Sequence, residues 1–200
     1  MTKPSALVAV LAGGLGSRLG GDKAAVRLSG RPLLSYPLAA ARAAGLPAVV
    51  VAKRGSELPR LQAEVLHEPD EPRHPLCGLL AALEHAAGME PPAAVLALPC
   101  DMPFLTGPLL AWLASMQGPV VLRAQGRLQP LPARCPTVAL RVLAARPPAE
   151  PLGRALSSLE PRVVGEDELA AFGEPERLCF NVNDAGDLAT AASWLAREAA

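Results

Sequence analysis

A glycine-rich stretch near the N-terminus, LAGGLGSRLGGDK at residues 11–23, contains the residue types that bind anions. The peptide N–H groups of such a turn can approach a phosphate closely, because glycine places no side chain between them. Arg18 and Lys23 add positive charge, and Lys23 is one of only three lysines in a chain that otherwise uses arginine. The stretch therefore predicts a loop that binds a phosphate group.

Two common phosphate-binding patterns do not fit this loop. A Walker loop needs its lysine directly after the last glycine, but Asp22 lies between Gly21 and Lys23. A dinucleotide fingerprint needs G-x-G-x-x-G, and Leu19 occupies the place of the third glycine. A glycine-rich turn with two solvated cations is the alternative interpretation at this point.

Two further segments end in polar side chains after an apolar run. Asp101 lies in LALPCDMPFL (96–105), and an oxygen ligand just past a strand is suited to a hard divalent cation. An aspartate that only forms a turn is the alternative there. In FNVND (180–184) the alternation of strand side chains predicts that Asn181 and Asn183 face the same way. Together with the glycine-rich loop, the segments predict a triphosphate site in which Asp101 holds Mg²⁺.

The elements that position these residues follow from short apolar runs alternating with alanine- and leucine-rich segments. Buried strands are predicted at 6–12, 47–52, 93–99, 119–124 and 177–182. Helices are predicted at 32–44, 76–88, 107–116, 137–145, 152–159 and 185–197. Thr106 and Asp184 are expected helix starts, and Pro37 should delay or kink the first helix. The alternation predicts a three-layer α/β/α fold with a mostly parallel sheet, which binds ligands beyond its carboxyl ends.

Length and composition limit the classes of function. The 200 residues predict one domain over 1–200, and 19 basic against 19 acidic side chains exclude a general electrostatic attraction to nucleic acid. No apolar run is long enough to span a membrane. The cysteines are too far apart in sequence to suggest a zinc cluster or a disulfide framework: Cys77, Cys100, Cys135 and Cys179. We therefore expect a cytoplasmic protein with no membrane partner.

The order of these motifs resembles the molybdenum cofactor guanylyltransferase (MobA) family. The resemblance is carried by L-A-G-G-x-x-S-R-x-G-G-D-K, P-C-D-M-P and N-V-N, and it continues in GRPLLSYPL, HPLCGLLAAL and QPLPARCPTVAL. It implies a Rossmann-like fold of the nucleotide-diphospho-sugar transferase type. It also implies that a phosphate oxygen of molybdenum-bearing molybdopterin attacks the α-phosphorus of GTP, which yields the guanine dinucleotide cofactor and pyrophosphate. Molybdoenzyme apoproteins or their chaperones are the protein partners that it implies.

The resemblance also implies roles for individual residues. GTP is expected to contact the backbone of the loop at Leu11, Ala12, Gly13 and Gly14. Lys23 and Arg18 are expected to act catalytically on the phosphates, with Asp101. Asp101 is expected to bind both nucleotide and Mg²⁺, and Asn183 is expected to be a second metal contact.

The chain departs from the family pattern at three places. Glu68 stands where the family usually has an aspartate near the nucleoside, Ala52 where it often has an asparagine, and His74 where a glycine is common. Two alternatives stay open: a related nucleotidyltransferase for molybdopterin cytosine dinucleotide, a sugar or another cofactor, and a non-catalytic nucleotide-binding module. A cytidylyltransferase should have alanine in place of one loop glycine, and pyrophosphate release separates both enzymes from the non-catalytic module.

Overall fold

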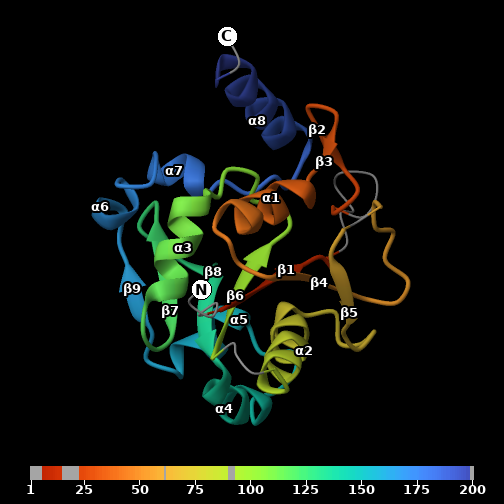
Figure 1. The fold of residues 1–200 in the computed structure, drawn as a ribbon, viewed down its shortest axis with the longest axis vertical. Coiled ribbons are helices and arrows are strands. Elements are labelled where there is room, and N and C mark those ends of the chain that lie inside the picture. Colours follow the sequence, from red (N-terminus) through yellow and green to blue (C-terminus); the bar gives the residue numbers. More distant parts are fainter. Residues whose placement is uncertain (1–5, 15–22, 61, 90–92, 199–200) are drawn as a thin grey trace.

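The centre of the protein is a seven-stranded sheet with the strand order β5-β4-β1-β6-β8-β7-β9 (Figure 1). The computed structural model describes residues 6–14, 23–60, 62–89 and 93–198. Neighbouring strands pair in parallel except where β8 meets β6 and β7. The strands are β1 (Leu7–Leu11), β4 (Ala48–Ala52), β5 (Glu64–His67), β6 (Ala94–Pro99), β7 (Val120–Ala124), β8 (Arg127–Pro136) and β9 (Arg162–Val164). A small hairpin, β2 (Arg27–Leu28) and β3 (Arg31–Pro32), lies outside this sheet.

Helices cover both faces of the sheet, as the alternating pattern predicts. One core contains side chains of α1 (Ser35–Ala43) and α3 (Gly107–Ser115), and also of the short helices α6 (Glu166–Leu169) and α7 (Pro175–Leu178). The opposite core contains side chains of α2 (Pro75–Ala87), of α4 (Leu140–Ala144) with its preceding 3₁₀ turn (Thr137–Ala139), and of α5 (Leu152–Ser157). The three-layer α/β/α architecture is therefore confirmed.

The central strand β1 shows why the sequence produces this arrangement. Its residues are all apolar, and successive side chains enter opposite cores: Val8 and Val10 on one face, Leu7 and Ala9 on the other. A strand that is buried on both faces has such a continuous apolar sequence, because neither set of alternating side chains faces solvent. In the register, Leu11 pairs with Val51 of β4 and with Pro99 of β6. The loops that follow these three strands consequently emerge at one edge of the sheet.

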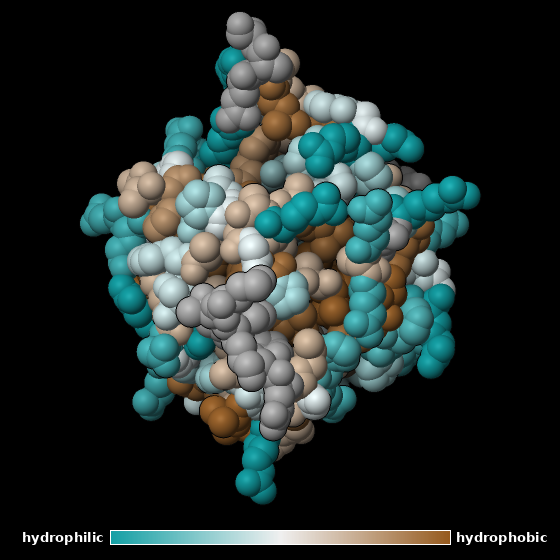
Figure 2. All heavy atoms as spheres, in the orientation of Figure 1, coloured by the Kyte–Doolittle hydropathy of each residue, from teal (hydrophilic) through white to brown (hydrophobic). Residues whose placement is uncertain are grey.

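The last helix, α8 (Ala185–Glu198), packs outside the sheet, near the β2–β3 hairpin (Figure 1). Hydrophobic residues are visible along this helix (Figure 2). They join a third apolar cluster, which holds Leu28, Phe104 and Val182. The helix begins as predicted, because Asp184 Oδ1 accepts hydrogen bonds from the backbone N–H groups of Gly186 and Asp187.

The predictions at Thr106 and Pro37 are also confirmed. Thr106 Oγ1 accepts a hydrogen bond from the Leu109 N–H at 3.4 Å, so this residue caps α3. The helix predicted from residue 32 begins at Ser35, which places Pro37 in its first turn. In the first turn a backbone N–H has no partner within the helix, so proline is tolerated there.

The strand predicted at 177–182 is wrong. Residues 175–178 form α7, and the chain then continues without strand structure to Asp184. Pro175 at the start of the helix favours this outcome, because proline is well suited to the first helical turn. The apolar residues of the segment are nevertheless buried, since Phe180 packs edge-on against Trp194 and Val182 is inaccessible to solvent.

None of the four cysteines forms a disulfide, and all four are buried. Burial raises the pKa of the Cys135 thiol to about 12 and that of Cys179 to about 11, so both stay protonated and unreactive at neutral pH. In the part of the chain that the structure describes, no helix is both long enough and apolar enough to cross a membrane.

Substituting Gly107 tests the close packing of α1 on α3. A Cβ at this position would lie 2.8 Å from Ala43 Cβ and 3.0 Å from the Ala43 carbonyl carbon. We expect Gly107→Ala to lower the free energy of unfolding by about 1–3 kcal/mol, measured by urea denaturation, because the backbone must shift. Gly153→Ala is the matched control: its Cβ would meet nothing nearer than 4.0 Å on the exposed side of α5. That control should stabilise the protein by about 0.5–1 kcal/mol, and equal effects would contradict the packing argument.

Candidate functional site

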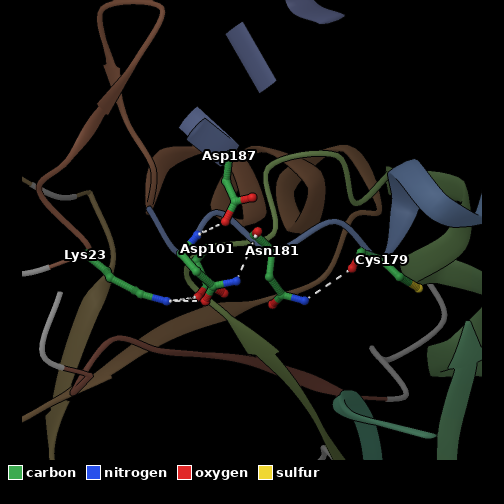
Figure 3. Close-up of polar contacts among 6 residues, drawn as sticks. Lys23, Asp101, Cys179, Asn181 and Asp187 are labelled. Carbon is green, nitrogen blue, oxygen red and sulfur yellow. Dashed lines mark hydrogen bonds and ion pairs between the residues drawn. The ribbon is translucent and has the colours of Figure 1, made fainter. Parts of the chain in front are cut away.

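Three distant segments meet at the ammonium group of Lys23. Lys23 Nζ donates to Asp101 Oδ2 at 2.7 Å and to Asn183 Oδ1 at 2.8 Å. In Figure 3 the side chains of Lys23 and Asp101 point toward one another. Asp101 follows β6 at the carboxyl edge of the sheet, and Lys23 is the last residue of the glycine-rich stretch 11–23 that begins at the end of β1. The structure therefore brings together Lys23, Asp101 and Asn183, three of the residues that the sequence assigns to the phosphates and the metal.

The segment after α7 is held in place by its backbone. The Val182 N–H donates to the Asp101 carbonyl at 2.9 Å. The Asn183 N–H donates to Oδ2 of Asp187, which Figure 3 labels, at 2.8 Å. Asn181 does not share the role of Asn183, because its amide donates to the Cys179 carbonyl at 3.2 Å (Figure 3). The prediction that the two asparagines act from the same side of a strand is thus wrong, since no strand forms here.

Asp101 retains one oxygen for a ligand. Its Oδ2 faces Lys23, whereas Oδ1 is buried and has no hydrogen-bond partner among the described residues. A buried carboxylate oxygen without a partner is costly, and a hard cation would satisfy it. Among the described residues no group of three or more His, Cys, Asp or Glu side chains converges on a possible metal position. The donor set suits Mg²⁺, which in nucleotide sites takes one or two carboxylates and completes its shell with phosphate oxygens and water.

Glu68 lies over two glycines at the other side of the site. It is only 8% exposed, and a Cβ at Gly13 would fall 1.9 Å from its Oε1. A Cβ at Gly78 would fall 3.0 Å from Oε2. The absence of a side chain at both glycines therefore leaves room for the Glu68 carboxylate, which lies against the backbone at Gly13.

Lys53 is a buried cation beside this site that the sequence-based predictions do not include, and Arg73, an exposed cation that lines the cavity of the site, is another. Lys53 directly follows β4, is 4% exposed, and its Nζ lies 3.6 Å from Glu68 Oε1. The same Nζ donates to the Pro69 carbonyl at 2.5 Å. The family pattern points instead to Ala52, whose side chain is buried in the core. The scarcity of lysine that singled out Lys23 applies equally to Lys53 and could have identified it.

A cavity of about 220 Å³ lies between Glu68 and the pair of Lys23 and Asp101. Its lining includes Leu11, Gly13, Gly14, Lys23, Glu68 and Asp101. Ala12, also assigned to the nucleotide, has its side chain in the core between α1 and the sheet. His74 lines the cavity and caps α2, because its Nδ1 accepts from the Leu76 N–H at 3.4 Å. Arg18 lies outside the described residues.

Comparison with known proteins agrees with this geometry. The family model described as "MobA-like NTP transferase domain" matches residues 8–163, which is more than half of the chain. The chain belongs to the MobA-like NTP transferase family. A molybdenum cofactor guanylyltransferase of Cereibacter sphaeroides is 35% identical over 199 residues, which cover 95% of this chain and 97% of that relative.

Solved structures of other MobA-like proteins and of related nucleotidyltransferases have the same fold as this protein. Molybdopterin-guanine dinucleotide biosynthesis protein A from Archaeoglobus fulgidus has a TM-score of 0.78 at 22% identity, over 96% of this chain and 99% of its own. The 2-C-methyl-D-erythritol 4-phosphate cytidylyltransferase of Thermus thermophilus has a TM-score of 0.63 at 22% identity, over 98% and 100% of the two chains. The nucleotidyltransferase fold of the sequence prediction is therefore confirmed.

Proposed function

We propose that this protein transfers GMP from GTP to molybdenum-bearing molybdopterin, which yields molybdopterin guanine dinucleotide and pyrophosphate. The observation that supports the proposal is the contact of Lys23 with Asp101 after β6 and with Asn183 before α8. The guanylyltransferase of Cereibacter sphaeroides, similar over nearly the full length of both chains, supports guanine as the base. The fold alone does not choose the base, because a cytidylyltransferase shares it.

The chemistry follows from the charges in the cavity. A phosphate oxygen of the pterin forms a bond to the α-phosphorus of GTP while the bond from that phosphorus to the bridging oxygen breaks, and pyrophosphate leaves with the electron pair. The attacking phosphate is already ionised, so no general base is required. The task of the protein is to hold both phosphates in line and to stabilise the charge on their oxygens. Lys23 supplies that positive charge, and the backbone at Gly14, which has open space beside it, lets the nucleotide approach closely.

Asp101 would hold Mg²⁺ through its unpartnered Oδ1, and Asn183 offers its side-chain oxygen beside it. When bound, the ion would neutralise negative charge on the nucleotide phosphates. Lys23 contacts both the Oδ2 side of Asp101 and the oxygen of Asn183. A phosphate that draws Lys23 toward itself therefore also makes these oxygens available.

A comparison of nucleotides tests the proposal. Binding of GTP, CTP and ATP is measured by calorimetry with Mg²⁺ present, and pyrophosphate release is measured after molybdenum-bearing molybdopterin is added. We expect GTP to bind most tightly, and pyrophosphate to appear only when GTP and the pterin are both present. A preference for CTP would contradict the guanine assignment. Tight GTP binding without pyrophosphate release would indicate the non-catalytic module.

A further inference from the structure

The buried ion pair between Lys53 and Glu68 is a feature that phosphate chemistry leaves unexplained. Both side chains are almost inaccessible to solvent, with exposed side-chain fractions of 3% and 6%. Lys53 reaches Glu68 Oε1 at 3.6 Å and anchors the following loop through the Pro69 carbonyl at 2.5 Å. Burying two charges costs free energy, and replacement by apolar side chains is often neutral or stabilising. A role beyond stability would account for the pair.

The topology places this pair at the end of the site away from the phosphates. Glu68 follows β5, whereas Asp101 follows β6, and two strands, β4 and β1, separate β5 from β6. Three strand spacings amount to roughly 14 Å between the strand axes. Glu68 and Asp101 nevertheless line one cavity. A nucleotide whose phosphates lie at Lys23 and Asp101 would extend its base toward Glu68.

The protonation state of Glu68 decides which base edge it can recognise. An ionised carboxylate only accepts, and it offers two oxygens to two parallel donors. Guanine presents two donors side by side on its Watson–Crick edge, N1–H and the 2-amino group, whereas adenine and cytosine each present a donor beside an acceptor. A protonated carboxyl would donate from one oxygen and would match the adenine or cytosine pattern instead.

Lys53 is placed to control this state. Burial raises the pKa of the Glu68 carboxyl above its ordinary value, and the charge of the Lys53 ammonium opposes part of that rise. The stem of Lys53 also approaches the loop, because a Cβ at Gly13 would lie 3.6 Å from its Cγ. The ammonium charge of Lys53 and the position of its stem therefore both act on the Glu68 carboxylate, from the end of β4.

We propose that Lys53 is a positioning residue which keeps Glu68 ionised and directed into the cavity, so that Glu68 accepts hydrogen bonds from both donors of the guanine edge. This inference rests on the proposed function, since it concerns the base of the same nucleotide. Guanine selectivity then depends on Lys53 together with Glu68 rather than on Glu68 alone, which explains why the lysine is buried beside the carboxylate.

The test compares GTP with ITP, whose base lacks the 2-amino group. Wild-type protein should bind GTP at least about tenfold more tightly than ITP, the ratio expected for a hydrogen bond to a charged acceptor. Lys53→Met removes the ammonium and keeps the stem, so the GTP:ITP affinity ratio should fall to about one. Lys53→Arg keeps the charge and should restore most of the ratio. Circular dichroism and thermal unfolding establish that each variant is folded.

A second variant keeps the inference testable if Lys53→Met does not fold. Lys53→Gln lacks the charge but keeps an N–H donor for the Pro69 carbonyl. Its GTP:ITP affinity ratio should also fall to about one. A ratio that is unchanged in a folded neutral variant, or a loss of affinity that is equal for GTP and ITP, would overturn the role of Lys53. Wild-type preference for CTP would instead reject the proposed function, so the two failures are distinguishable.

Discussion

Lys23→Met is expected to lower the rate of GMP transfer about a thousandfold. Two unit charges about 4 Å apart in a partly solvated site interact by about 4 kcal/mol, and each 1.4 kcal/mol of transition-state stabilisation corresponds to a factor of ten in rate. The Lys23 side chain is 19% exposed, so its site is of this partly solvated kind. Pyrophosphate release under saturating GTP, Mg²⁺ and molybdenum-bearing molybdopterin measures the effect.

The variant also removes the partner of Asp101 Oδ2, so its folding must be checked. Loss of this hydrogen bond should cost about 1–2 kcal/mol of the roughly 5–15 kcal/mol of unfolding free energy that is typical of a folded protein, so the variant should stay folded but be measurably less stable. Arg141→Ala removes an exposed cation from α4, a helix on the α2 side of the sheet, and should retain full activity. Normal turnover by folded Lys23→Met protein would exclude Lys23 from the reaction.

Asp101→Asn is expected to abolish Mg²⁺-dependent GTP binding and to reduce transfer by a similar factor of about a thousand. The amide has the same shape and can still accept from Lys23, but it lacks the negative charge that a hard cation requires. The sharpest measurement is a calorimetric titration of GTP at increasing Mg²⁺. The wild-type affinity should rise with the Mg²⁺ concentration, whereas the affinity of the variant should not respond.

A nearby carboxylate provides the control for Asp101. Asp184 caps α8, where asparagine serves about as well as aspartate, so Asp184→Asn should change neither stability nor the Mg²⁺ response. An Asp101→Asn protein whose GTP affinity still rises with Mg²⁺ as in the wild type would show that another group holds the ion.

Much of the fold could be predicted because parallel strands buried on both faces are recognisable as short apolar runs. The runs at 6–12, 47–52, 93–99 and 119–124 correspond within a residue or two to β1, β4, β6 and β7. The strand β8 was missed because its sequence, RLQPLPARCP, contains three prolines, which cannot donate to a ladder and argue against a strand inside a sheet. The pairing of β7 with β8 shifts register between Val121 and Leu122, opposite this proline-rich part.

The site could be predicted where chemistry depends on residue type and chain order, and not where it depends on a contact across the sheet. Lys23, Asp101 and Asn183 stood out as polar residues in loops, and the structure joins them. Lys53 did not stand out, because a lysine after a strand usually lies in solvent. The scarcity of lysine marks Lys53 as much as Lys23, but it does not predict burial, which results from the contact of the β5 loop with the end of β4.

The contact between Lys23 and Asn183 spans 160 residues of chain, and Asp101 is tied to Val182 by a backbone hydrogen bond. During synthesis on the ribosome the sheet and most of its helices are translated before residue 183 emerges. A nascent chain that has completed only the region matched by the family model, residues 8–163, still lacks Asn183 and the helix behind it. Lys23 can therefore gain its hydrogen bond to Asn183 only after residue 183 has left the ribosome, when the strands of the sheet have already been translated.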